Sequence, residues 1–184
     1  MKKLMITAAL FVAGTSAVMA QRMLDRAAKA TFDATSPSSP EKIVGVNNEV
    51  AFVVVSTDGK MQIQMPVNSF KFEKALMKDH FNENYMESEK YPKAEFKGQI
   101  TNLAEVNFKK DGTYPTKVTG KLTIHGVTNE VTVTGSTTVK GEVVTMNAKF
   151  KVELNDYKIS VPGVVADKLA KMAVISITGQ GSFK

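Results

Sequence analysis

The amino-acid sequence predicts an all-β protein, an eight-stranded antiparallel up-and-down barrel with one or two short helices between strands. Apolar and polar residues alternate with a period of two in most segments beyond Arg22, which is typical of strands with one buried face. Short turn-like joints separate these segments, so neighbouring strands must be antiparallel. Closure into a barrel also removes the exposed sheet edges that promote aggregation.

Residues 1–20 precede this pattern and have the composition of a secretory signal peptide. Lys2 and Lys3 form a positive start, residues 4–13 form a short apolar run, and Ala20 is a small residue at the expected cleavage position. The apolar run is too short for a membrane span, and a retained anchor is the alternative interpretation. The sequence therefore predicts a signal peptide at 1–20 and a barrel domain at 21–184, in a periplasmic or secreted protein.

The strands follow one another through the rest of the chain. The clearest covers residues 145–154, whereas residues 50–55 form a continuous apolar run. The dipeptides Asp58-Gly59 and Asp111-Gly112 are hairpin signals between strands. In chain order, the segments predicted as strands are 29–35, 50–55, 61–65, 95–100, 105–109, 117–124, 131–135, 145–154 and 175–183.

Residues 70–90 interrupt the alternation and contain good helix formers. Spacings of three and four residues place Leu76 and His80 on one helical face, and Phe81 and Tyr85 on another. Pro92 then restarts an extended segment. We expect one or two short helices that bridge two strands near a barrel mouth.

Glycine recurs in phase with the apolar residues of the strands. Strands usually exclude glycine, because it has no side chain to pack. Two explanations stay open: glycines permit the sharp bends of a barrel strand, or their missing side chains leave room for a ligand. The glycines concerned are Gly98, Gly120, Gly135, Gly179 and Gly181.

Composition and charge exclude several classes of function. The formal net charge is +6, and removal of Lys2 and Lys3 with the signal peptide would leave it at +4 (22 basic against 18 acidic residues). No dense basic tract with interleaved aromatics suggests nucleic acid, and an anionic membrane surface is the better electrostatic partner for a transient contact. With no cysteine and two histidines, a metal centre is not expected.

No enzyme is predicted, because the sequence contains no familiar nucleophile, phosphate-binding or metalloprotease motif. His125 falls in a turn, where a solvated or turn-bonding role is expected. His80 is interpreted as a structural histidine, the alternative being a polar group that meets a ligand head.

The inward face of the predicted barrel is apolar, so any lumen would be dry and would suit a hydrocarbon chain. The mouth candidates are Phe70, Phe72, Leu76, Phe81 and Tyr85, with Tyr85 and His80 as contacts for a head group. The residues predicted to line the lumen are Phe96, Ile100, Leu122, Ile124, Val133, Met146, Phe150, Ile175 and Ile177. The alternative is a structural or protein-interaction barrel whose core is filled by its own side chains.

Three strings resemble blocks of the YceI-like family. Residues 120–128 (GKLTIHGVT) resemble its G-x-L-T-I-H-G-V-T signature, residues 79–96 resemble its H-L…F-F…Y-P-x-x-F segment, and residues 150–159 resemble a third block. The resemblance implies a lipocalin-like periplasmic barrel that binds a polyisoprenoid or isoprenoid-quinone-like amphiphile for storage or transport. It also implies a homodimer. No cofactor is expected beyond a bound polyisoprenoid, quinone or fatty-acid-like ligand.

Overall fold

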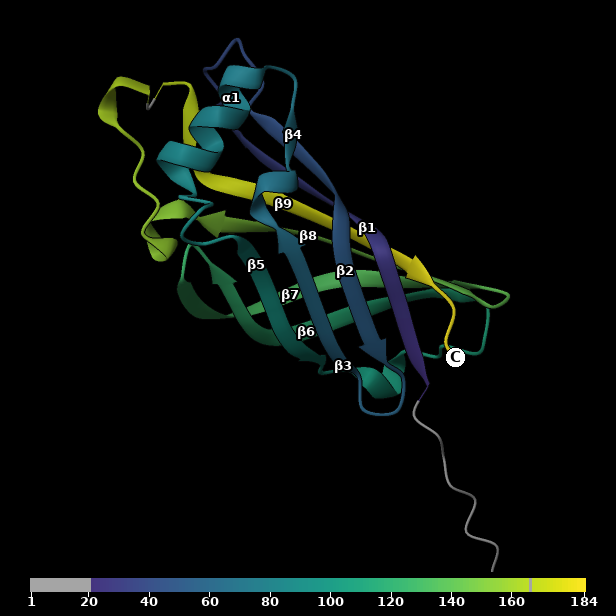
Figure 1. The fold of residues 1–184 in the computed structure, drawn as a ribbon. Helices are drawn as coiled ribbons and strands as arrows, with labels where there is room; N and C mark the ends of the chain where they lie inside the picture. Colours follow the sequence, from purple (N-terminus) through teal and green to yellow (C-terminus); the bar gives the residue numbers. More distant parts are fainter. Residues whose placement is uncertain (1–20, 166) are drawn as a thin grey trace, which may run out of the picture.

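A computed structural model describes residues 21–165 and 167–184 of the chain. The predicted signal peptide, residues 1–20, lies outside the described residues. From Arg22 onward most residues belong to strands of one sheet, which curves around a central core (Figure 1).

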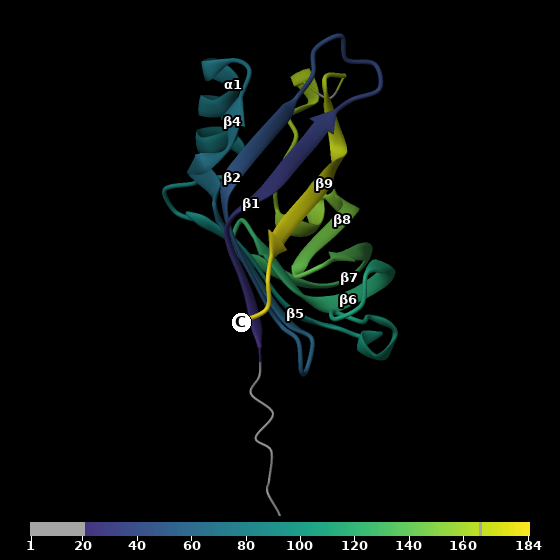
Figure 2. The same ribbon diagram turned by 90° about the vertical axis from the view of Figure 1, so that its right-hand side faces the viewer.

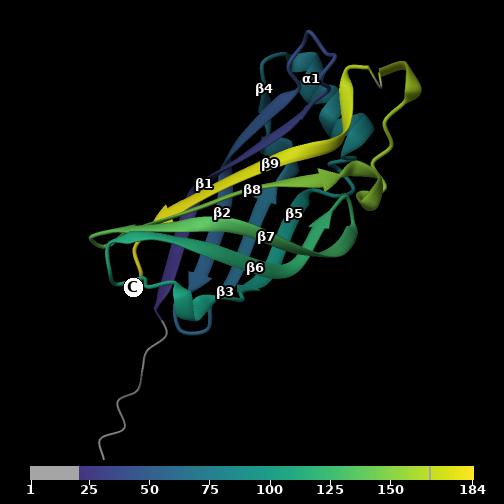
Figure 3. The ribbon, with the colours of Figure 1, turned by 180° about the vertical axis from the view of Figure 1, so that it is seen from behind.

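Eight long strands form a closed antiparallel meander, which confirms the predicted fold class. Each long strand pairs with the next long strand along the chain, and β1 pairs with both β2 and β9, so the sheet closes on itself. The two-residue strand β4 pairs with β2. The view from behind shows β6 and β7 on the side opposite β1 and β2 (Figure 3). The strands are β1 (Arg22–Thr35), β2 (Val44–Val55), β3 (Lys60–Pro66), β4 (Lys71–Phe72), β5 (Lys93–Ile100), β6 (Gly112–Ile124), β7 (Val127–Lys140), β8 (Val143–Glu153) and β9 (Leu169–Gly181).

The segment between β3 and β5 forms the predicted helical bridge. The 3₁₀-helix η1 (Val67–Ser69) and the two-residue strand β4 lead into α1 (Ala75–His80), and α1 continues directly into the π-helix η2 (Phe81–Tyr85). We call residues 73–91, which include α1 and η2, the lid. In Figure 2, α1 lies beside β4 and the upper ends of β1 and β2. The end of the barrel under the lid is the mouth.

The predicted strand at 105–109 is wrong. Leu103–Glu105 forms the 3₁₀-helix η3, and a turn follows in which the Asn107 carboxamide accepts a hydrogen bond from the Lys109 amide (2.9 Å). Val106 is buried, and Phe108 packs against Phe183 with ring centroids 4.7 Å apart. Alternate residues of this turn therefore point into the protein, which imitates the pattern of a strand.

The end of the barrel opposite the lid is filled with side chains, and we call it the closed end. Thr116 and Thr137 share a buried hydrogen bond there (2.7 Å). Its largest apolar side chains are at most 2% exposed, namely those of Met23, Val54, Ile100, Val139 and Val144. The free space of the lumen lies in the other half, toward the mouth.

Two further 3₁₀-helices, η4 (Leu154–Tyr157) and η5 (Gly163–Val165), lie between β8 and β9. The connection from β6 to β7 is a two-residue turn, in which Ile124 pairs with Val127. Its central residues, His125 and Gly126, have φ angles of 51° and 71°, as tight hairpin turns of type I′ require. This turn and η4 lie together at the mouth, because a ring nitrogen of His125 bonds the Tyr157 carbonyl.

Candidate functional site

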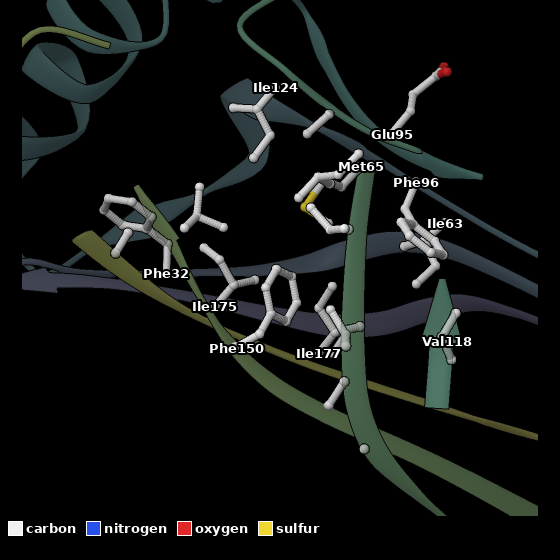
Figure 4. Close-up of a pocket in the computed structure, with 18 of the residues that line it drawn as sticks. Phe32, Ile63, Met65, Glu95, Phe96, Val118, Ile124, Phe150, Ile175 and Ile177 are labelled. Carbon is white, nitrogen blue, oxygen red and sulfur yellow. The ribbon is translucent and has the colours of Figure 1, made fainter. Parts of the chain in front are cut away.

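A cavity of about 130 Å³ lies inside the barrel between the lid and the closed end. All eight long strands contribute residues to its wall, whereas the two-residue strand β4 does not. The labelled side chains of Phe32, Ile63, Phe150 and Ile175 converge on a common space from different strands (Figure 4). The cavity is therefore a product of the barrel's closure, because its walls are distant in sequence.

The polar members of the lining do not present charge to this space. The Glu95 carboxylate points away from the cavity (Figure 4) and pairs with Lys97 (3.1 Å). The Thr116 hydroxyl bonds Thr137, and the Asn147 carboxamide accepts a hydrogen bond from Thr178 (2.8 Å). An apolar guest would meet almost only carbon and sulfur atoms, and a charged guest would find no partner.

Glycines in the wall are covered by neighbouring aromatic rings. Gly98 and Gly120 are directly paired on β5 and β6. A Cβ atom built on Gly98 would lie 2.5 Å from Cζ of Phe96, and a Cβ on Gly120 would lie 2.4 Å from the Lys97 carbonyl oxygen. The two strands approach too closely here for side chains, and the ring of Phe96 occupies the space above both glycines. The two explanations, strand bending and room for a ligand, stay predictions.

The lid closes the mouth with Phe81. Its side chain is buried, lines the cavity and lies inside a cluster of aromatic rings, with centroid distances of 5.5 Å to Phe32, 5.4 Å to Phe70 and 4.9 Å to Phe72. Tilted pairs at these distances are favourable beyond their buried area. In the π-helix, the Met86 amide donates to the Phe81 carbonyl five residues earlier, which turns Met86 inward as well.

Polar contacts hold both ends of the lid. At its start, the Lys74 ammonium pairs with Glu41, and this hydrogen bond lowers the pKa of the Glu41 carboxyl and raises that of Lys74. At its end, Glu87 bonds Nε2 of His125 (2.7 Å). The backbone carbonyl of Tyr157 bonds the other ring nitrogen of His125, and burial raises the pKa of the Tyr157 phenol. The lid is thus fastened to the β1–β2 loop and to the β6–β7 turn.

The structure brings most of the predicted site residues to the cavity. Those in its lining are Phe70, Phe81, Phe96, Leu122, Ile124, Val133, Met146, Phe150, Ile175 and Ile177. Whether they contact a ligand stays a prediction.

Five predicted residues lie outside the lining. Ile100 is buried at the closed end beside Gly59, because β5 ends there. Phe72 forms a second layer behind Phe81, with its ring over Gly45. The other three lie on the lid: Leu76 is 63% exposed, His80 is exposed, and Tyr85 is half-buried against the core. The lid turns its Phe81 face inward, so the opposite face meets solvent.

Sequence reasoning missed part of the lining. Phe52 lies in the continuous apolar run 50–55, which has no alternation to show which residues face inward. The predicted lining also omits Met61, Ile63 and Met65, although their alternation with polar residues is a signal that could have identified them. Phe32 lies in β1, whose phase is shifted by bulges earlier in the strand.

Other kinds of site find little support in the part of the chain that the structure describes. There, no group of three or more His, Asp and Glu side chains is arranged to hold a metal ion. Within the same residues, none of the helices has both the length and the apolar character needed to span a bilayer.

Solved structures of low sequence identity share this fold. A polyisoprenoid-binding domain from Saccharophagus degradans matches with a TM-score of 0.75 at 12% identity, over 90% of this chain and 100% of that one. BcnA from Burkholderia cenocepacia matches with a TM-score of 0.65 at 18% identity, over 86% and 99%. The YceI protein of Campylobacter jejuni matches with a TM-score of 0.55 at 15% identity, over 100% and 90%.

A comparison with curated protein sequences finds no match. A family model, by contrast, covers most of the chain. The model of the YceI-like domain matches residues 22–178, which extend from the first residue of β1 almost to the end of β9. The chain therefore belongs to the family of YceI-like domains.

Proposed function

We propose that this protein is an exported lipid-binding protein, which holds the apolar chain of an isoprenoid or fatty-acyl amphiphile in the barrel lumen. The observation that carries the proposal is the apolar cavity under the lid, in whose lining the side chains of Glu95, Thr116 and Asn147 bond other parts of the protein. The family match and the likeness to a polyisoprenoid-binding domain support the same class of ligand. A polar head group would remain at the mouth, since the lumen offers it no partner.

The volume of the cavity limits how much chain it holds as it stands. A cavity of about 150 Å³ lined by Leu, Ile and Phe accommodates benzene. On that scale, the 130 Å³ here holds about five carbon atoms, the size of one prenyl unit. At about 0.8 kcal/mol per buried methylene, five carbons contribute about 4 kcal/mol, which corresponds to a dissociation constant of about 1 mM.

A longer chain therefore requires the lumen to expand. Micromolar binding needs about 8 kcal/mol, or about ten buried carbons before the costs of association. Four lining residues are methionines (Met61, Met65, Met86 and Met146), whose flexible side chains adapt easily to a guest. The ring of Phe96 is a further group whose displacement would open space, because glycines lie beneath it.

The proposal is tested with isoprenoid alcohols of increasing length: prenol, geraniol and farnesol. Isothermal titration of the purified protein should show binding that strengthens from prenol to geraniol, because the second unit buries further methylenes. Organic extraction of the protein purified from its native host, followed by mass spectrometry, should recover a chain of this class.

Two neighbouring residues of β8 provide a matched pair of variants. Ala148 lines the cavity, whereas Lys149 lies on the outer face. Ala148→Leu adds three carbons to a space for about five, so geraniol binding should weaken at least tenfold. Lys149→Ala should bind like the unchanged protein. Circular dichroism and thermal unfolding of both variants verify that each retains the fold.

Empty extracts together with no saturable binding of any of the three alcohols would refute the proposal and favour the self-filled barrel. Export is tested separately by N-terminal sequencing of the mature protein from the periplasmic fraction. We expect Gln21 as the first residue, since the small residue Ala20 precedes it. A first residue of Met1 would refute cleavage at this site.

A further inference from the structure

His125 lies at a junction of three elements at the mouth. Its ring bonds the Glu87 carboxylate of the lid through Nε2 (2.7 Å) and the Tyr157 carbonyl of η4 through Nδ1 (3.1 Å). The histidine side chain is 10% exposed, whereas that of Glu87 is 47% exposed. The ring of Tyr91, at the end of the lid, meets the edge of the imidazole at a centroid distance of 4.6 Å.

Both hydrogen-bond partners of this imidazole are acceptors. A backbone carbonyl cannot donate, so Nδ1 must carry a proton in its bond with Tyr157. A carboxylate also only accepts, so Nε2 must carry a second proton in its bond with Glu87. The complete arrangement therefore belongs to the doubly protonated, positively charged ring. A neutral ring satisfies one of the two contacts and sets a lone pair against the other acceptor.

Both residues of the contact between the lid and the β6–β7 turn have uncommon backbone conformations. Glu87 and His125 have φ angles of 43° and 51°, in the left-handed region that non-glycine residues rarely adopt. A Cβ atom on Gly126 would lie 2.4 Å from Cε1 of Tyr91, so the turn is also fitted closely against the lid. Two residues in uncommon conformations thus meet each other, which is the kind of outlier that occurs at functional contacts.

Two other ionisable groups near the ring have pKa values that are shifted further from mild pH. On the lid side, Lys90 lies over the Tyr91 ring at 4.9 Å, and its pKa is raised by that partner. On the η4 side, burial raises the pKa of the Tyr157 phenol, and Asp156 accepts from Asn129 through its backbone carbonyl. Between pH 5 and 8, imidazole is the side chain whose charge ordinarily changes.

We propose that this junction is a pH-sensitive latch: the charged ring of His125 fastens the lid to the barrel at mildly acidic pH, and loss of one ring proton at higher pH loosens it. The latch concerns the lid alone and holds for any occupant of the lumen. Under the proposed function, looser closure of the mouth would speed the entry and exit of a lipid chain.

Hydrogen exchange of the lid tests the latch without any ligand. The lid amides of residues 75–91 are compared at pH 6 and pH 8, with protection expressed relative to the unfolded chain and to the amides of β6. Lid protection should fall about five- to tenfold at pH 8, the effect of losing one charge-assisted, partly exposed hydrogen bond. Protection of β6 should not change.

Three variants separate the latch from general effects of pH. In Glu87→Gln, the amide can donate to the unprotonated Nε2 of a neutral ring, so lid protection should stay high at both pH values. In His125→Asn, which tolerates a positive φ, protection should be low at both. His80→Asn removes the other histidine of the chain, which is exposed on α1, and should retain the full pH dependence.

Nitrogen NMR of the His125 ring gives an independent measurement. We expect protons on both ring nitrogens at pH 6 and on Nδ1 alone at pH 8. The proposal is overturned if Nε2 carries no proton at pH 6, or if unchanged protein and His125→Asn show the same pH dependence of lid exchange. Because no lipid is used, failure of the latch leaves the lipid-binding proposal to be judged by its own titrations.

Discussion

Replacement of Gly120 by alanine tests how closely β5 and β6 approach each other. A Cβ atom at this position would lie 2.4 Å from both the Lys97 carbonyl oxygen and the Gly98 Cα atom. Ordinary contacts of this kind begin near 3.4 Å, so the overlap is about 1 Å with each atom. Both obstacles are backbone atoms of the paired strand, which cannot rotate away as a side chain could.

The expected cost follows from two opposing effects. Overpacking of a close-packed site costs about 1–3 kcal/mol, and a backbone obstacle belongs at the upper end of this range. Loss of glycine's freedom in the unfolded chain stabilises by about 0.4–1 kcal/mol. We therefore expect Gly120→Ala to lower the free energy of unfolding by about 2 kcal/mol, and the melting temperature by about 4–8 °C.

Thermal and urea unfolding measure this effect, with Gly163→Ala as the control. A Cβ atom on Gly163 meets nothing within 4 Å and its φ lies outside the left-handed region, so this variant should be as stable as the unchanged protein or slightly more so. A melting temperature of Gly120→Ala within 1 °C of the unchanged protein (below the roughly 2 °C expected per kcal/mol) would refute the close approach of the two strands.

Two further predictions concern the lumen wall and the mouth. The three atoms nearest to a Cβ atom on Gly179 belong to the ring of Phe52, at 2.7–2.9 Å, so Gly179→Ala should be destabilised by about 1–2 kcal/mol. Phe52→Leu in the same chain should recover part of this loss, and a simple sum of the two single effects in urea unfolding would argue against the contact. Burial raises the pKa of the Tyr157 phenol above its usual 10.0, so this group ionises first in the unfolded chain. The free energy of unfolding should therefore fall as pH rises above 10. This dependence on pH should be weaker in Tyr157→Phe, and an equal dependence in both proteins would exclude Tyr157 as its source.

The strands with regular alternation were predicted well, because a period of two is set by the pleat itself. On β6 and β8, the residues in one phase face the lumen over the whole length, as Leu122 and Phe150 do. This regularity also identified part of the lining, including Met146 and Ile177. Long antiparallel neighbours with short turns leave few topologies open, so closure could be predicted from the same pattern.

Local irregularities hid other parts of the site from sequence reasoning. On β1, Met23 and Ala28 both face inward although they are five residues apart, because bulges shift the register between Asp25 and Ala30. The Asp25 carboxylate accepts hydrogen bonds from the amides of Ala27 and Gln180 there, in place of strand pairing. On the lid, the π-helical turn brings Phe81 and Met86 to the same side, a spacing that the 3.6-residue period does not describe.

The contents of the lumen depend on rotamers, which alternation does not encode. The glycines of the lumen wall can leave an open channel or a nearly filled core, depending on the rotamers of the neighbouring phenylalanine rings. Here Phe96 lies over Gly98 and Gly120, and Phe52 lies over Gly179, so the space left is 130 Å³. Those rings rest on glycine and face a cavity, so little backbone must move to displace them. Under the proposed function and the proposed latch, ring displacement and lid release are two separable steps of binding. Variants at Phe96 should change the length of chain that binds, whereas variants at His125 should change how fast it binds.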